Sequence, residues 1–358
     1  MNQENSDQYK DKNNSANFAK YKGKGLTGLA NLGNTCFLNS TVQCLSHTYE
    51  FNEFLDKKTY KEKLSRKPDS LLLVEWDKLR ELMWSENCTI QPGGFINNVQ
   101  KVAKLKNKDL FTGWAQNDLP EFLLFIIDAF HTAIMREVEM NIKGTTENDT
   151  DKLAVECYKM MKNMYSKEYS EILQIFYGIH VSTINDKQDN LLSMSPEPFF
   201  MIDLPIPSKR GHITIIDCFE EYVKSEELSG DNAWYNEKTE QKQDVNKKLV
   251  FWSLPNIMVL TLKRFTNSNS KNNTTVEFPL ENLDLCKYVK GYNSNTYIYD
   301  LYGICNHLGS PMGGHYTSFV KNANDKWYHF NDTNVKEVKN ESSMIGSQAY
   351  CFFYRKRN

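Results

Sequence analysis

The spacing of apolar residues divides the chain into a first half with helical periodicity and a second half with short apolar runs. In the first half, apolar side chains recur every three or four positions, which places them on one face of a helix. Pro120 also suits a helix start, because the N–H that proline lacks would be unpaired in a first turn. The pattern predicts helical stretches at residues 36–47, 71–83, 120–135 and 151–176.

The second half of the chain predicts strands. Short runs rich in β-branched and aromatic residues, bounded by Pro, Gly or polar clusters, are typical of strands. Such runs occupy residues 199–206, 257–265, 297–304, 315–321, 327–330 and 349–355. We therefore expect an α+β fold, with a helical lobe over 26–175 and an antiparallel β lobe over 176–356. A cleft between two such lobes is a common place for a functional site.

Charge and hydropathy limit the possible partners. The chain carries 43 Lys and Arg against 45 Asp and Glu, a net charge of −2, which lacks the bulk positive charge of a nucleic-acid binder. The longest strongly apolar stretch, 122–130, is too short to span a bilayer. We expect no nucleic acid and no membrane as a partner, and a monomer by default. Residues 1–24 are polar and lack periodicity, which predicts a disordered tail.

The cysteines point to a reducing environment. Eight are scattered along the chain, and none forms a C-x-x-C pair. This pattern resembles neither a dense disulfide framework nor a zinc ribbon. The first residues also have no apolar core of the kind found in secretory signals. We expect a cytoplasmic or nuclear protein.

The segment GLANLGNTCFLNSTVQCL, at residues 28–45, is the first candidate for chemistry. Cys36 stands at a predicted helix start, where the helix dipole favours the nucleophilic thiolate. Gly33 gives the preceding loop backbone freedom, and Asn31 on that loop could direct its amide at a developing oxyanion. Taken alone, such a cysteine is more often a small buried hydrophobe, so both interpretations stay open at this point.

A second candidate segment, YGICNHLGSPMGGHYTSFV at residues 302–320, is soon followed by WYHFND. His315 follows two glycines and opens a predicted strand, which a turn at 322–325 folds back on WYHF. A histidine among aromatic residues is by default a packed or surface side chain. Its role therefore depends on which residue the hairpin places beside it.

The register of this hairpin decides the partner of His315. A hairpin centred on residue 323 places His315 opposite Asn331, and directly opposed residues have Cβ atoms about 5 Å apart. A hairpin centred on residue 324 instead pairs Tyr316 with Asp332. The sequence leaves both registers open. In the first register, Asn331 can bond one imidazole nitrogen and hold the other toward a thiol, as the third residue of a Cys-His site does.

These segments resemble the Cys box and the His box of the ubiquitin-specific proteases, a family of deubiquitinases. Three further segments are similar to motifs of that family and follow in its order: WAQNDLPEFLLFIIDAF at 114–130, LPNIMVLTLKRF at 254–265 and AYCFFYR at 349–355. The resemblance covers residues 25–356. It implies a papain-like cysteine peptidase with a helical thumb at 26–175 and fingers and palm at 176–356.

The resemblance also implies roles for individual residues. The nucleophile, general base, third triad residue, oxyanion donor and adjacent assisting acid match Cys36, His315, Asn331, Asn31 and Asp332, respectively. The positions implied to bind the C-terminal tail of ubiquitin are Asp118, Glu121, Gly313, Gly314 and Tyr316. The two acids would pair with tail arginines, since Arg–carboxylate pairs are directional, and the two glycines would let the backbone approach a Gly-Gly tail. The alternatives are a solvated helix face for the acids and an ordinary turn for the glycines.

One departure from the family lies in the fingers, where many members hold zinc with two C-x-x-C pairs. The four aligned positions carry no cysteine and are occupied by Asp186, Asp189, Asn236 and Thr239. Two carboxylates with an amide and a hydroxyl are a poor substitute for zinc ligands. We expect no structural zinc, and fingers that persist as a metal-free β-ribbon or are shortened.

The resemblance implies a cysteine-dependent deubiquitinase that cleaves the bond after the C-terminal glycine of ubiquitin in ubiquitin or polyubiquitin conjugates, without a cofactor. Residues 267–275 and 307–314 are expected to form mobile loops over the cleft. Three alternatives stay open: a non-catalytic ubiquitin-binding module, a protease for a ubiquitin-like modifier, and a general papain-like protease. The retained triad residues argue against the first, and the motif around Asp118 argues against the last.

Overall fold

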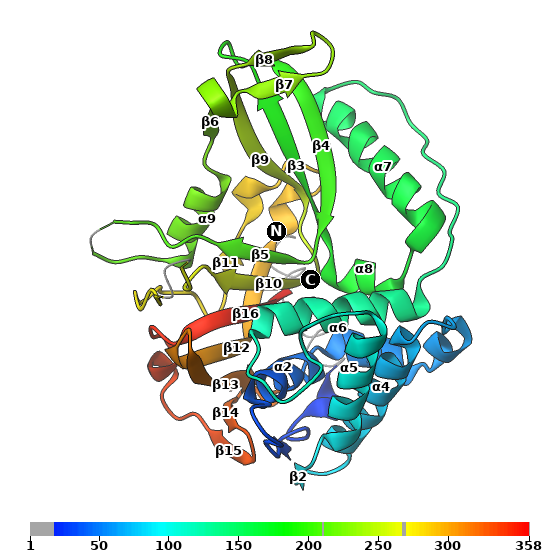
Figure 1. The fold of residues 1–358 in the computed structure, drawn as a ribbon, viewed down its shortest axis with the longest axis vertical. Coiled ribbons are helices and arrows are strands. Elements are labelled where there is room, and N and C mark those ends of the chain that lie inside the picture. Colours follow the sequence, from blue (N-terminus) through cyan, green and yellow to red (C-terminus); the bar gives the residue numbers. More distant parts are fainter. Residues whose placement is uncertain (1–17, 210, 267–269, 358) are drawn as a thin grey trace, which may run out of the picture.

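The structure, a computed structural model, describes residues 18–209, 211–266 and 270–357 and has the predicted α+β architecture. Figure 1 shows a group of helices packed beside one sheet, with a second, taller sheet rising above both. None of the helices in the described part of the chain combines the length and apolar composition needed to cross a membrane.

The first lobe is helical, as predicted. Its elements are η1 (Ala19–Tyr21), β1 (Gly28–Leu29), α2 (Cys36–Ser46), α3 (Tyr49–Asp56), η2 (Thr59–Lys63), α4 (Asp69–Ser85), β2 (Thr89–Ile90), α5 (Gly93–Leu105) and α6 (Leu119–Ile134). The two short strands pair with each other in parallel. Phe122, Ile126 and Phe130 of α6 have no exposed surface, and their spacing of four places them on one buried face. Burial of this face against its neighbours stabilises the lobe.

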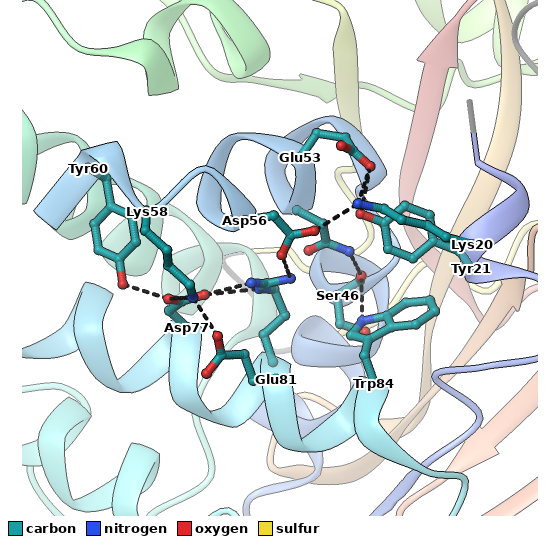
Figure 2. Close-up of polar contacts among 12 residues, drawn as sticks. Lys20, Tyr21, Ser46, Glu53, Asp56, Lys58, Tyr60, Asp77, Glu81 and Trp84 are labelled. Carbon is teal, nitrogen blue, oxygen red and sulfur yellow. Dashed lines mark hydrogen bonds and ion pairs between the residues drawn. The ribbon is translucent and has the colours of Figure 1, made fainter.

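Ion pairs and hydrogen bonds inside this lobe join α3, α4, Lys58 and η2 (Figure 2). Asp77 and Arg80 of α4 are almost fully buried and pair with each other at 2.7 Å, and Arg80 also pairs with Asp56 of α3 at 2.8 Å. Lys58 and the Tyr60 hydroxyl donate to Asp77 as well. Each buried charge therefore has an opposite partner, which avoids the large cost of an unpaired charge in the interior.

The first described residues of the chain correct the predicted tail. Residues 1–17 of that tail lie outside the described part of the chain, but within residues 18–24 two aromatic side chains pack on the lobe. Tyr21 is 4% exposed, and its ring stacks on the ring of Tyr49 with centroids 4.5 Å apart. The prediction was wrong for this stretch because two aromatic residues in a polar context, Phe18 and Tyr21, meet an aromatic surface of the lobe.

A mostly antiparallel sheet forms the palm, with strand order β15-β14-β13-β12-β16-β10-β5 and with β11 paired to β12. Its strands are β5 (Met201–Leu204), β10 (Ile257–Leu262), β11 (Leu283–Asp284), β12 (Ile298–Ser310), β13 (Gly313–Lys321), β14 (Trp327–Asn331), β15 (Asn334–Glu337) and β16 (Ala349–Lys356). Helix α2 packs on β12, β13 and β14, and side chains of both lobes share one core. The N-terminus of α2 is thereby placed on the strand that carries His315.

Two expected loops have a different outcome. The stretch 307–314 is not an open loop, because β12 continues to Ser310 and β13 begins at Gly313. Three residues of the stretch 267–275, namely 267–269, lie outside the described residues.

The predicted helix at 151–176 is divided into α7 (Asp149–Glu168) and α8 (Glu171–Phe176).

The fingers are present as a sheet of strand order β4-β3-β9-β6, with the hairpin β7–β8 nearby. The elements are β3 (Gly178–Asn185), β4 (Leu191–Phe199), α9 (Ile215–Val223), β6 (Glu226–Leu228), η3 (Gly230–Asn232), β7 (Trp234–Asn236), β8 (Gln241–Gln243) and β9 (Val245–Ser253), and α7 runs alongside β4 (Figure 1). Three further 3-10 turns lie in the palm region: η4 (Cys286–Tyr288), η5 (Ser294–Thr296) and η6 (Glu341–Met344).

The four positions aligned with zinc cysteines lie in two turns of the fingers. Asp186 Oδ1 accepts hydrogen bonds from the backbone N–H groups two and four residues later, each at 2.8 Å. Asn236 Oδ1 accepts the N–H two residues later at 3.0 Å. Asp189 accepts from Lys248 Nζ at 2.6 Å, and Thr239 accepts from a glutamine amide. Within the described ranges, no group of three or more His, Cys, Asp or Glu side chains is arranged to hold a metal ion.

Candidate active site

Cys36 is the first residue of α2 and is 3% exposed. The loop before it turns sharply, with Gly33 at φ 106° and Asn34 at φ 55°. Helix α2 carries no charged side chain and is buried along its whole length, which explains why it can lie between the two lobes. Thr35 occupies the N-cap position, but its side chain bonds to the loop rather than to the helix backbone.

The electrostatic surroundings of Cys36 differ from the expectation at a helix start. Burial raises the pKa of the Cys36 thiol above its ordinary value of 9.0, and the negative charge of Asp332 also raises it. Backbone hydrogen bonds, the strongest from Tyr316, act in the opposite direction without cancelling the rise. The free protein therefore favours the thiol at neutral pH. The helix dipole favours the thiolate, but burial and a neighbouring carboxylate act against it.

His315 and Asn331 are brought together by the hairpin of β13 and β14. His315 Nε2 lies 2.8 Å from Asn331 Oδ1. The strands pair Ser318 with Phe330 and continue to the turn in a register centred on residue 324, so the register centred on 323 is wrong. Pairing stops at Ser318, and beyond that point the side chain of His315 reaches Asn331 diagonally.

Asp332 joins the end of β14 to the loop that precedes Cys36. Its Oδ1 accepts from Asn39 Nδ2 at 2.8 Å, its Oδ2 accepts from Asn31 Nδ2 at 3.1 Å, and its carbonyl accepts the Leu29 N–H at 2.9 Å. Asn31 Oδ1 also accepts N–H groups of its own loop. The predicted oxyanion donor and the predicted assisting acid are thus hydrogen-bonded to each other.

Sequence reasoning missed Asn39, which is 3% exposed and lies one helical turn after Cys36. The signal that could have identified it is a polar residue in the apolar segment CFLN, since a buried amide needs a partner. Its partner, Asp332, lies 293 residues away, and only the fold brings the two together.

The predicted tail-binding acids lie at the start of α6. Asp118 Oδ1 accepts from the hydroxyls of Tyr316 and Tyr350, each at 3.1 Å. Burial raises the pKa of Asp118 above its ordinary value, and the nearby charge of Glu121 also raises it, against the two hydroxyl donors. Glu121 itself is exposed. A second carboxylate and two buried phenols therefore surround Asp118, beside the strand that carries His315.

The predicted glycines differ from each other in their surroundings. A Cβ on Gly314 would lie 2.4 Å from both His307 Nε2 and the Leu308 carbonyl oxygen, so glycine is required there by packing inside the palm. A Cβ on Gly313 would meet only Gln116 Oε1, at 3.4 Å. Gln116, which lies in the motif before α6, was also missed as a functional candidate; its amide bonds both backbone groups of Gly314.

The whole chain was compared with known proteins. The family model described as "Ubiquitin carboxyl-terminal hydrolase" matches residues 27–354. The chain belongs to the ubiquitin carboxyl-terminal hydrolase family. It is 34% identical over 346 residues to ubiquitin carboxyl-terminal hydrolase 2 of Homo sapiens, covering 92% of this chain and 55% of that protein. It is 31% identical over 365 residues to ubiquitin carboxyl-terminal hydrolase 4 of Saccharomyces cerevisiae (strain ATCC 204508 / S288c), covering 92% and 39%.

The chain thus spans about half or less of the length of these two hydrolases, whereas it covers 93% of ubiquitin carboxyl-terminal hydrolase 2 of Gallus gallus at 34% identity. Among solved structures, the SAGA Ubp8/Sgf11/Sus1/Sgf73 DUB module bound to ubiquitin aldehyde contains a chain of the same fold. The TM-score is 0.70 at 26% identity, over 94% of this chain and 71% of that one. This hydrolase domain therefore shares the family fold from one lobe to the other.

Proposed function

We propose that this chain is a deubiquitinating thiol hydrolase that cleaves the isopeptide or peptide bond after the C-terminal glycine of ubiquitin. The observation that carries the proposal is the 2.8 Å contact between His315 and Asn331 on the strands against which the Cys36 helix packs. A nucleophile, a base and a residue that orients the base are the parts that thiol hydrolysis needs. Membership of the hydrolase family supports the same activity.

In the proposed reaction, Cys36 Sγ attacks the carbonyl carbon of the terminal glycine while His315 accepts the thiol proton. Asn331 holds His315 through Nε2, which leaves Nδ1 to face the thiol. The tetrahedral intermediate then collapses, the C–N bond breaks, and His315 returns the proton to the leaving amine. Water, activated by the same imidazole, hydrolyses the thioester and releases ubiquitin with a free carboxylate.

Asn31 is the proposed donor to the oxyanion. Its amide carries two hydrogens, of which one bonds Asp332 and the other remains for the substrate. Asp332 would act by fixing the direction of that amide. Backbone N–H groups at the start of α2 would add further donors to the developing charge.

The proposed substrate is ubiquitin or a polyubiquitin conjugate, with its tail along Tyr316 and between Gly313, Gly314 and the acids Asp118 and Glu121. The solved family structure with bound ubiquitin aldehyde supports this choice. All eight cysteines are free thiols, which suits a reducing compartment of a eukaryotic cell. No cofactor has a part in the proposed steps.

Mass spectrometry with ubiquitin that bears a C-terminal thiol-reactive warhead tests the proposal. We expect one covalent adduct on the wild-type chain and none on Cys36→Ala, while Cys88→Ala, which removes an exposed cysteine, keeps the adduct. An adduct that persists in Cys36→Ala would place the nucleophile elsewhere. A folded wild-type chain that forms no adduct would favour a ubiquitin-like modifier or a non-catalytic binding module, which the same warhead on such modifiers separates.

A further inference from the structure

The edge of β13 on its β14 side is not paired with a strand over its first five residues. On one side, β12 pairs with β13 from Gly313 to Val320. On the other side, β14 pairs with β13 only from Ser318 to Lys321. Within the described ranges, no strand pairs with residues 313–317 on that side. An unpaired strand edge presents N–H and C=O groups that an extended peptide can use.

Side chains occupy this edge in place of a strand. Gln116 Oε1 accepts the Gly314 N–H at 3.1 Å, and Gln116 Nε2 donates to the Gly314 carbonyl at 3.1 Å. Two residues further along, the backbone of Tyr316 hydrogen-bonds to Cys36. Two residues beyond that, Ser318 enters the pairing with β14. Alternate residues of a strand direct their backbone groups to the same edge, so Gly314 and Tyr316 present theirs along one edge, about 7 Å apart, and Cys36 is bonded at the second of these positions.

The amide of Gln116 resembles a peptide unit in what it offers. It presents one C=O and one N–H side by side, and it bonds both backbone groups of one residue, as a partner residue in an antiparallel sheet does. The loop that carries it is anchored in the helical lobe, because Gln100 donates to the Gly113 carbonyl at 3.0 Å and Asn34 donates to the Trp114 carbonyl at 2.9 Å. Gln116 therefore connects the helical lobe to β13 two residues before the strand position that bonds Cys36.

We propose that Gln116 is a displaceable latch, which holds both backbone groups of Gly314 in the free protein and is displaced when an extended substrate tail adds to the edge of β13. The inference rests on the proposed function, because it names the surface on which the substrate tail would lie. Gln116 is exposed, and hydrogen bonds that compete with water contribute little net stability. The latch is therefore weak enough for a tail to replace. Because Gln116 must leave Gly314 before the tail binds, the latch slows substrate binding and not the chemical step.

Variants at Gln116 test the latch, because any side chain at Gly314 would collide with His307. Gln116→Ala removes both bonds, and Gln116→Glu keeps an acceptor but loses the N–H donor. Gln100→Ala is the matched control, since it removes a glutamine bond to the same loop and leaves the edge of β13 occupied. Each protein is treated with three reagents: ubiquitin with a C-terminal warhead, a Gly-Gly dipeptide with the same warhead, and iodoacetamide. The second-order rate constants are compared.

We expect Gln116→Ala to react about three- to ten-fold faster than the wild type with both warhead probes, the range set by losing two solvent-exposed bonds. Gln116→Glu should also react faster, whereas Gln100→Ala should match the wild type. Iodoacetamide, which does not need the strand edge, should react equally with the wild type, Gln116→Ala and Gln100→Ala. Unchanged or slower reaction of Gln116→Ala with the warhead probes would overturn the latch, and slower reaction would indicate that Gln116 holds the substrate instead.

Hydrogen exchange separates the failure of the latch from the failure of the proposed function. The Gly314 N–H should exchange faster in Gln116→Ala than in the wild type or Gln100→Ala, whichever probe reacts, and equal exchange would overturn the latch. The wild type could fail to react with the ubiquitin probe while Gln116→Ala still raises the rate of the dipeptide reaction and of Gly314 N–H exchange. That result would support the latch and show that the proposed substrate is wrong.

Discussion

The proposed catalytic junction, formed by Asn31, Asn39, His315 and Asp332, and the turns of the fingers use the same polar residue types in opposite ways. At the junction, the carboxylate of Asp332 accepts amides of Asn31 and Asn39, which lie 301 and 293 residues away along the chain. In the fingers, Asp186 and Asn236 accept backbone N–H groups two to four residues away. The first arrangement depends on the whole fold, and the second depends only on local sequence.

This difference indicates where the protein tolerates amino-acid substitutions. A local turn can be rebuilt from any residue that caps its own backbone. That tolerance suits a fingers sheet in which acidic and polar residues stand at the positions that the family resemblance aligns with zinc ligands. A long-range amide–carboxylate contact has no local replacement, because its partner comes from a distant segment. Removing Asp332 takes that acceptor from the buried amide of Asn39. Substitutions should therefore affect the junction far more than the fingers.

The largest effect is expected at the imidazole of the junction. His315→Ala should lower kcat for a ubiquitin conjugate by roughly 10²- to 10⁴-fold, because the thiol proton loses its acceptor. KM should change little, and His329→Ala on the neighbouring strand should retain activity. Steady-state kinetics with a fluorogenic ubiquitin substrate measures both. Equal losses in the two variants would show that the hairpin, rather than the base, carries the effect.

A smaller effect with two opposite readouts is expected for Asp332→Asn. The asparagine side chain keeps one oxygen as an acceptor, but its NH2 group faces the NH2 group of Asn31 or Asn39. Because Asn31 then loses its fixed orientation, kcat should fall by roughly 10- to 100-fold. The negative charge at Asp332 raises the pKa of Cys36, so removing it lowers that pKa. The midpoint of iodoacetamide alkylation against pH should therefore move to lower pH. If alkylation and hydrolysis fall together, a folding defect is the explanation.

An intermediate effect is expected at Glu171 of α8, which connects the helical lobe to the fingers. Burial alone would raise the pKa of Glu171, but hydrogen bonds from Arg136 and Lys63 outweigh it and lower the pKa to about 2. A carboxylate with a lowered folded-state pKa stabilises the protein above its unfolded pKa of about 4.5 and loses that contribution as the pH falls toward 2.

Glu171→Gln should therefore lower the free energy of unfolding by about 1 kcal/mol at pH 7, a figure reduced for partial solvent screening. The gap between variant and wild type should close as the pH falls from about 4.5 toward 2. Denaturant titrations at several pH values measure it, with Glu62→Gln as a control in the same lobe. A gap that is independent of pH would exclude the ion pairs as its cause.

The smallest effects are expected in the fingers. Treatment with EDTA should leave Tm unchanged within about 1 °C, because the turns are closed by their own hydrogen bonds. Asp186→Ala should leave kcat and the alkylation of Cys36 unchanged and lower Tm by less than about 2 °C. A clear fall of Tm with EDTA would contradict this comparison by revealing a metal in the fingers.

The helices were predictable where periodic apolar positions are dense. The predicted ranges 36–47, 71–83 and 120–135 agree with α2, α4 and α6 to within about two residues, because apolar residues recur at helical spacing along each of them. The break between α7 and α8 was not predicted. At this break the backbone of Tyr169 pairs with that of Arg136. The sequence has no glycine or proline there to indicate that the helix ends.

The residues of the candidate site could be predicted from the sequence, but their contacts with one another could not. Motif resemblance identified the residues proposed for chemistry, whereas the hairpin register and the raised pKa of Cys36 needed the fold. Asn39 and Gln116 were missed because their partners, Asp332 and Gly314, lie about 200 to 300 residues away. Amides of this kind look like ordinary surface or helix residues until the partner is known.

The separation of 279 residues between Cys36 and His315 also has a consequence for timing. At about 5–20 residues per second, a ribosome needs roughly 15 to 60 s to extend the chain from the first to the second. During that interval the thiol has neither the proposed base nor the strands on which its helix packs. A nascent chain would therefore leave the conjugates around it intact, and the proposed activity would appear abruptly once the β13–β14 hairpin emerges and docks.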